Sequence, residues 1–132
     1  MSSENDKSLE ADVLAATLQG GLQESQDLLE FLARKFEGTL SHLMAVRRKG
    51  GLLSKSRVVE EITFRFDERH FQITRDPRGF VATKILKEVR GVVLKTNPVE
   101  VDVWLRELAV ELAQQAERST ALRAALSRFI LE

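Results

Sequence analysis

The sequence predicts a small α+β protein in which an antiparallel sheet of three to four strands packs against N-terminal and C-terminal helices. Apolar residues recur at helical spacing before residue 46, alternate with polar residues between residues 61 and 74, and return to helical spacing after residue 100. Short turn sequences separate the central strands, which favours a meander. The expected element order is therefore α-α-β-β-β(-β)-α-α, with helices covering one face of the sheet.

Two helices are expected in the N-terminal third of the chain. Leu9–Leu18 has the apolar spacing of a helix, and Gly20-Gly21 is expected to weaken or break it. Ser25 is expected to cap a second helix that runs to about Val46 and stops at Gly50-Gly51. The apolar stripe of this second helix consists of Leu29, Leu32, Phe36, Leu40 and Leu43.

The central strands are predicted from alternation and from turn residues. In "RVVEEITFRF" and "FQIT" the apolar side chains alternate with polar ones, and "DPRG" at 76–79 has the composition of a type I turn. Phe64, Phe66, Phe71 and Phe80 are expected to face inward. Residues 80–96 form either one strand that continues past a bulge near Gly91 or two separate strands.

The C-terminal helices have the clearest local signals. Asn97 suits an N-cap, Pro98 the first helical position and Glu100 the third, so a helix is expected from there to about Glu117. Ser119 is expected to cap a last short helix. The predicted core face of the longer helix consists of Val101, Trp104, Leu105, Leu108 and Leu112.

Length and composition suit one folded unit. Residues 1–7 are polar and are expected to form a disordered tail, and residues 8–132 a single domain. No apolar run has the length of a membrane helix, and the start of the chain lacks the pattern of a secretory signal. The chain has no cysteine, which excludes disulfides and thiolate chemistry. A cytoplasmic location is the default expectation.

Charge is balanced overall, with 20 basic and 20 acidic residues, but it is unevenly distributed along the chain. Residues 47–95 contain 13 basic and 6 acidic side chains. A candidate anion-binding cluster lies at the start of this region and consists of Arg47, Arg48, Lys49, Lys55 and Arg57. The neighbouring "GGLLSKS" does not match a phosphate-binding loop, because glycine is absent from positions 49 and 54 and the stretch follows a helix. It is expected to be a joint between two elements.

No catalytic, metal-binding or cofactor-binding residue is predicted. His42 lies just beside the apolar stripe of the second helix, and His70 stands in a polar turn with Asp67 and Glu68. A turn of this kind could contribute to a metal site only with further convergent ligands. Polar residues are also what a hairpin turn normally contains. The chain is therefore expected not to be an enzyme.

The remaining functional signal is a set of apolar residues placed off the predicted core faces, which either contact a partner or are buried between the sheet and the terminal helices. These candidate interface residues are Leu28, Phe31, Val99, Val103 and Val110. They predict a small interaction protein that acts through contacts with a partner or with a second copy, most simply as a homodimer. The alternative is a nucleic-acid-associated protein that binds the phosphate backbone through residues 47–95. No membrane partner is expected.

Overall fold

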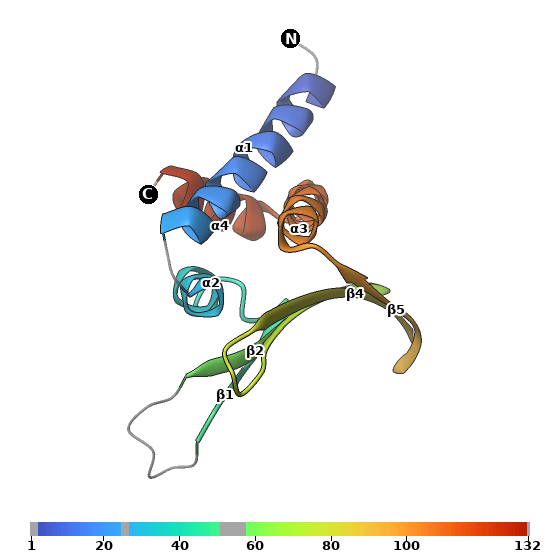
Figure 1. Cartoon of the computed structure of the whole chain (residues 1–132). Helices are drawn as coiled ribbons and strands as arrows, with labels where there is room; N and C mark the ends of the chain where they lie inside the picture. The colour runs from blue at the N-terminus through green and yellow to red at the C-terminus, as the bar shows by residue number, and fades with distance from the viewer. Residues whose placement is uncertain (1–2, 25–26, 51–57, 132) are drawn as a thin grey trace.

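The predicted fold class is confirmed, with five strands in place of three or four. The computed structural model describes residues 3–24, 27–50 and 58–131, and within them the chain forms four helices and a five-stranded antiparallel sheet (Figure 1). The elements are α1 Ser3–Glu24, α2 Leu28–Phe36, β1 Met44–Arg48, β2 Val59–Phe66, β3 Arg69–Arg75, β4 Val81–Val89, β5 Val92–Val99, α3 Val101–Ala116 and α4 Thr120–Leu131.

The sheet is a meander, because its strands are ordered β1-β2-β3-β4-β5 and each pairs antiparallel with its sequence neighbour. All four helices lie on one side of it (Figure 1). Helices α2 and α3 contact the sheet at β2 and β4, and α1 and α4 pack against these two helices. The β4–β5 hairpin extends past the helical layer (Figure 1).

The core joins the covered face of the sheet to the helices through aromatic side chains. Phe64 makes edge-to-face contacts with Phe36 of α2 and Trp104 of α3, at centroid distances of 6.4 and 6.3 Å. Trp104 also donates a hydrogen bond from Nε1 to the Lys84 carbonyl of β4, at 3.1 Å. The predicted core face of α3 is confirmed for Trp104, Leu105, Leu108 and Leu112, which are fully buried, and Val101 packs against them.

Helix α1 begins and ends outside its predicted limits. It starts at Ser3, within the expected tail, and continues through Gly20-Gly21 to Glu24. The two glycines do not break the helix. A tertiary contact explains why one of them, Gly21, is a glycine. The ring of Phe31 lies where a Cβ atom on Gly21 would be, whereas nothing approaches the corresponding position on Gly20. Gly21 thus lets α1 approach α2 closely.

The second helix is much shorter than predicted. It ends at Phe36, turns occupy residues 37–43, and Met44–Arg48 form strand β1 instead of the end of a helix. The turns keep spacings of three and four residues, since the Leu40 and Met44 amides donate to carbonyls four residues earlier. An apolar stripe at helical spacing therefore continues past the helix itself. The expected cap at Ser25 lies outside the described residues, and Asp27 caps α2 instead.

The start of α3 also differs from the prediction. Asn97, Pro98 and Val99 belong to β5, where they pair with Ile85, Lys84 and Thr83 of β4, and the N-cap is Glu100. The local capping signal is overridden by strand pairing, and a proline without an N–H is tolerated because β5 is an edge strand. The predicted cap of the last helix is confirmed, since the Ser119 hydroxyl accepts the Leu122 amide at 3.1 Å.

Residues 80–99 form two strands joined by a two-residue turn. Arg90 and Gly91 both have positive φ, of 52° and 81°, as a tight hairpin turn requires. The turn at 76–79 is confirmed, with Gly79 donating to the Asp76 carbonyl at 2.9 Å. The inward orientation expected for Phe80 is wrong, because its side chain is exposed beneath the Arg78 guanidinium just after that turn.

Candidate interaction surface on the outer hairpin

The outer part of the β4–β5 hairpin carries an exposed run of large apolar side chains. Val92, Val93 and Leu94, named here the apolar triplet, have exposed fractions of 58%, 49% and 60%. They lie on β5, an edge of the sheet in which every residue from Val92 to Pro98 is exposed. A long apolar edge strand offers unpaired backbone groups and apolar side chains together, which is typical of strand-pairing interfaces.

A β-bulge shapes this edge. Lys87 pairs with Lys95 but Glu88 pairs with Val93, so Leu94 is an extra residue on β5. A bulge increases the local twist and bends the strand. The hairpin curves away from the helices beyond this region (Figure 1). The apolar triplet consequently stands clear of the helical layer and is accessible to a partner.

A groove lies beside the triplet, between α3 and the inner part of the hairpin. Its volume is about 490 Å³, and its lining includes the apolar side chains Ile85, Val99 and Val103. Glu68 and Glu107 contribute acidic groups to the same lining. The groove is open to solvent along a sheet edge, a geometry that suits an extended segment of another chain better than an enclosed small molecule.

Three cations form a row across the floor of the groove. Arg69 on β3 pairs with Lys87 on β4, which pairs with Lys95 on β5, so the three side chains share one face of the sheet. Arg69 approaches Glu107 and Glu111 of α3 at 3.5 and 3.4 Å. Lys87 and Lys95 form no ion pair with any residue that the structure describes.

The five predicted interface residues do not form one surface. Leu28 and Phe31 are buried in the core, with exposed fractions of 4% and 8%, so for these two residues the alternative of internal burial holds. The reason is that α2 packs between the sheet and the outer helices, which uses both of its apolar faces. Val99 and Val103 come together in the groove lining, and Val110 is exposed at 37% further along α3.

Of the three described members of the predicted anion-binding cluster, Arg47 and Arg48 are paired with carboxylates of the chain. Arg47 of β1 approaches Glu60 and Glu61 of β2 at 2.6 and 3.6 Å. Arg48 forms two hydrogen bonds with the Glu37 carboxylate, at 2.8 and 2.6 Å, which lower the pKa of Glu37 below its usual value. Lys49 is exposed at the end of β1.

The other two members of that cluster, Lys55 and Arg57, lie outside the described residues, as does most of the "GGLLSKS" stretch. Within the described part of the chain, the anion-binding prediction therefore rests on Lys49 alone. The cluster is a weaker candidate than the row of cations in the groove.

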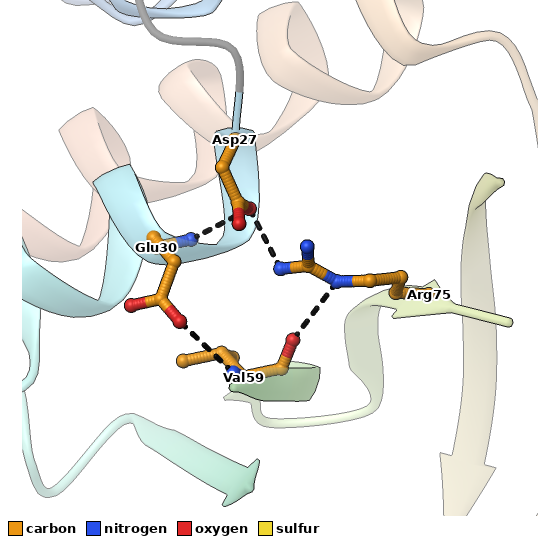
Figure 2. A network of polar contacts seen from close by, with 4 residues as sticks. All are labelled: Asp27, Glu30, Val59 and Arg75. Carbon is orange, nitrogen blue, oxygen red and sulfur yellow. Dashed lines mark hydrogen bonds and ion pairs between the residues drawn. The ribbon is translucent and has the colours of Figure 1, made fainter. Parts of the chain in front are cut away.

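Another cation of the basic region holds the fold together. The Asp27 carboxylate accepts the Glu30 amide at 3.1 Å and the Arg75 Nη2 at 2.7 Å (Figure 2). Arg75 Nε also donates to the Val59 carbonyl at 3.1 Å, and the Val59 amide donates to Glu30 at 3.0 Å (Figure 2). This closed network fastens the start of α2 to β2 and β3, so Arg75 serves the fold and is engaged internally.

Neither histidine belongs to a site of converging ligands. His42 is exposed in the turns before β1, instead of lying on a helix, and His70 is a buried residue of β3. The Nδ1 atom of His70 lies 3.5 Å from the Glu88 carboxylate. Among the described residues there is no group of three or more side chains that could hold a metal ion. No helix in the described part is long and apolar enough to span a bilayer.

The apolar triplet was not predicted from the sequence. The run "VVLK" shows apolar residues without alternation, which is equally typical of a strand buried on both faces. The position of β5 at the sheet edge, beyond the helices, distinguishes an exposed edge strand from a strand that is buried on both faces.

Comparison with protein-family models, with curated proteins and with solved structures yields no match to this chain. The outer hairpin and its groove are therefore interpreted from their own geometry.

Proposed function

We propose that the chain is a non-enzymatic interaction protein that forms a homodimer by antiparallel pairing of its β5 edge strands. The observation that carries this proposal is the exposure of Val92, Val93 and Leu94 on an uncovered edge. Because the three side chains are about half exposed, burying the rest of each would contribute on the order of 1 kcal/mol before association costs are subtracted. A monomer gains little from their exposed surface, because no element among the described residues covers it.

The chemistry of the triplet suits a second copy. In an antiparallel pair centred on Val93, each Val92 stands opposite Leu94 of the other copy and the two Val93 residues face each other. Apolar side chains thus meet only apolar side chains, and the pair has the two-fold symmetry of most homodimers. Lys95 falls beyond the triplet at each end, so the charged parts of the two edges are not superimposed.

The proposal is tested by molar mass from light scattering after gel filtration, across a wide range of protein concentration. The wild-type chain is expected to have the mass of a dimer, and the Val93→Gln/Leu94→Gln variant that of a monomer. Leu131→Gln is the matched control, because Leu131 is an exposed leucine on α4, away from the hairpin. A wild-type monomer at every concentration, or a double variant with unchanged mass, would refute the proposal.

A second pair of substitutions separates the strand edge from the helix surface that the sequence indicated. If α3 formed the interface, Val103→Glu/Val110→Glu would give a monomer. Pairing through β5 predicts that this variant keeps the mass of the dimer, because both valines lie outside the triplet.

Nucleic-acid binding remains the second candidate, favoured by one observation. Lys87, Arg90 and Lys95 are exposed together on the outer hairpin, and a two-stranded ribbon fits a nucleic-acid groove. This alternative predicts a mobility shift with double-stranded DNA that weakens steeply as salt rises. The Lys87→Gln/Lys95→Gln variant would reduce that shift, and the absence of any shift at low salt would rule the alternative out.

A further inference from the structure

Two lysines in the groove face each other, and neither forms an ion pair with a described residue. Lys87 and Lys95 are directly paired across β4 and β5, and like charges in such positions destabilise a sheet. The third cation of the row, Arg69, is offset by Glu107 and Glu111 and lies 5.1 Å from the centre of the Phe71 ring. The same helix provides no partner for the two lysines within the described residues.

The lysines adjoin a surface with two further properties. Ile85 and Val99 are half-buried side chains that pack against the core and also line the groove, as does Val103. Asn97 lies between Lys95 and Val99 on β5. Its side chain is exposed and offers both an amide donor and an acceptor. Cation, amide and apolar side chain thus follow one another along β5 at Lys95, Asn97 and Val99, beside an open groove of about 490 Å³.

We infer that this groove binds an extended acidic segment of a partner protein. A carboxylate of the segment lies between Lys87 and Lys95 and relieves their repulsion. An apolar side chain of the same segment packs on Ile85, Val99 and Val103. Asn97 bonds to the backbone of the bound segment at the strand edge. The bound segment supplies the negative charge that α3 supplies to Arg69.

The charges of the groove favour a peptide over a nucleic acid. Glu68 and Glu107 line the groove together with the cations. A phosphate backbone carries a charge at every nucleotide and would bring several of them against these carboxylates. A peptide can place one carboxylate at the lysines and uncharged residues elsewhere. Charge complementarity is therefore local, as in the recognition of a short acidic motif.

The inference goes beyond self-association and uses different residues. An antiparallel pair centred on Val93 covers Val92–Leu94 and leaves Asn97–Val99 uncovered, so the groove stays open in the proposed dimer. The Val93→Gln/Leu94→Gln variant is accordingly expected to bind an acidic peptide as the wild type does, whatever its own molar mass. Failure of the dimer and failure of the groove are thereby distinguishable.

The test uses the full chain and a fluorescein-labelled peptide in which glutamate alternates with valine and serine. Binding is followed by fluorescence anisotropy at low salt, with a glutamine-for-glutamate peptide as the ligand control. The Lys87→Gln/Lys95→Gln variant is expected to bind the glutamate peptide about tenfold more weakly, because two exposed ion pairs are lost. Lys84→Gln is the matched protein control, since Lys84 lies on the same strand but on the opposite face.

The expected result is saturable binding that needs glutamate, declines with added salt and depends on Lys87 and Lys95 but not on Lys84. Binding of both peptides with equal affinity, or an unchanged affinity in the double lysine variant, would overturn the inference. So would preferential binding of labelled single-stranded DNA that depends on the same two lysines. Thermal unfolding by circular dichroism verifies that each variant is folded before its affinity is compared.

Discussion

The hairpins β2–β3 and β4–β5 belong to one sheet but differ in almost every physical respect. In β2–β3 the cross-strand pairs Ile62–Ile73 and Phe64–Phe71 are fully buried beneath α2 and α3. In β5 every residue from Val92 to Pro98 is exposed, although it too is rich in β-branched side chains. Propensity therefore explains why both segments are strands, whereas helical cover alone explains which of them is core.

The charges of the two regions differ in the same way. Near β1–β3 several arginines have internal partners, as Arg48 has Glu37 and Arg75 has Asp27. On the outer hairpin Lys87 and Lys95 have none among the described residues. The difference indicates that the covered hairpin serves the fold and the uncovered one is available for binding. Four pairs of substitutions test this contrast, from the largest expected effect to the smallest.

The largest effect is expected at the centre of the covered hairpin. Phe64→Ala should lower the free energy of unfolding by about 3–5 kcal/mol, because a buried ring in contact with Phe36 and Trp104 is removed. Leu94→Ala should change it by less than about 0.5 kcal/mol in the monomer, since the side chain is exposed. Urea denaturation followed by circular dichroism measures both. Equal losses in the two variants would contradict the contrast.

The two hairpins also show which parts of the fold can be predicted from the sequence. Alternation and turn residues predict the strands, and the stripe around Trp104 predicts the core face of α3, because these patterns are local. The end of α2 was missed because the turns after Phe36 keep helical spacing. The cap at Asn97 was misplaced because pairing with Ile85 outweighs a local capping preference.

The candidate site could be predicted only in part. Angular position on a helix predicts Val99 and Val103 as interface residues. Both line the groove, although Val99 belongs to a strand. The same criterion predicts Leu28 and Phe31 as interface residues, but both are buried. Angular position on a helix does not reveal how many layers of structure cover the helix. The cross-strand approach of Lys87 to Lys95 depends on register, which a bulge shifts by one residue.

The contact between α1 and α2 provides the second test of tight packing in the covered region. Gly21→Ala should lower the free energy of unfolding by about 1–3 kcal/mol, because the new methyl group collides with the buried Phe31 ring. Gly20→Ala is the matched control and should raise stability by up to about 1 kcal/mol, since its position is open and alanine favours a helix. Thermal and urea unfolding measure the pair, and equal effects of both substitutions would exclude close packing at Gly21.

The polar network at the start of α2 is expected to have a smaller effect. Arg75→Met removes the ion pair with Asp27 and the hydrogen bond to Val59, and should cost about 1–2 kcal/mol. Arg78→Met, in the adjacent turn, loses only a contact with the exposed Phe80 ring and should cost less than about 0.5 kcal/mol. The urea concentration at the midpoint of unfolding compares the stability of the two variants. A cost for Arg78→Met as large as that for Arg75→Met would show that the network contributes nothing specific.

The smallest effect concerns pH. Hydrogen bonds from Arg48 lower the pKa of Glu37 in the folded chain, so the pair stabilises the fold above the unfolded pKa of Glu37. This stability is lost as the pH falls through the lowered folded pKa. The pair is partly exposed, so the loss should be only a few tenths of a kcal/mol.

A double-mutant cycle with Arg48→Met and Glu37→Gln, measured by urea unfolding at neutral and acidic pH, isolates this term. The coupling energy should be present at neutral pH and absent in acid. A coupling energy that does not change with pH would show that ionisation of Glu37 is not its source.

The packing of α1 against α3 has a consequence for the order in which the molecule is assembled. Each strand of the sheet pairs with its neighbour in sequence, so the sheet closes only short loops, whereas α1 and α3 are separated by the whole sheet. During synthesis Leu14 and Leu18 leave the ribosome before the sheet, and α3, which helps to bury them, leaves after it. The sheet lies between α1 and α3 in the sequence. The time needed to translate the sheet therefore sets how long the two leucines stay exposed to chaperones.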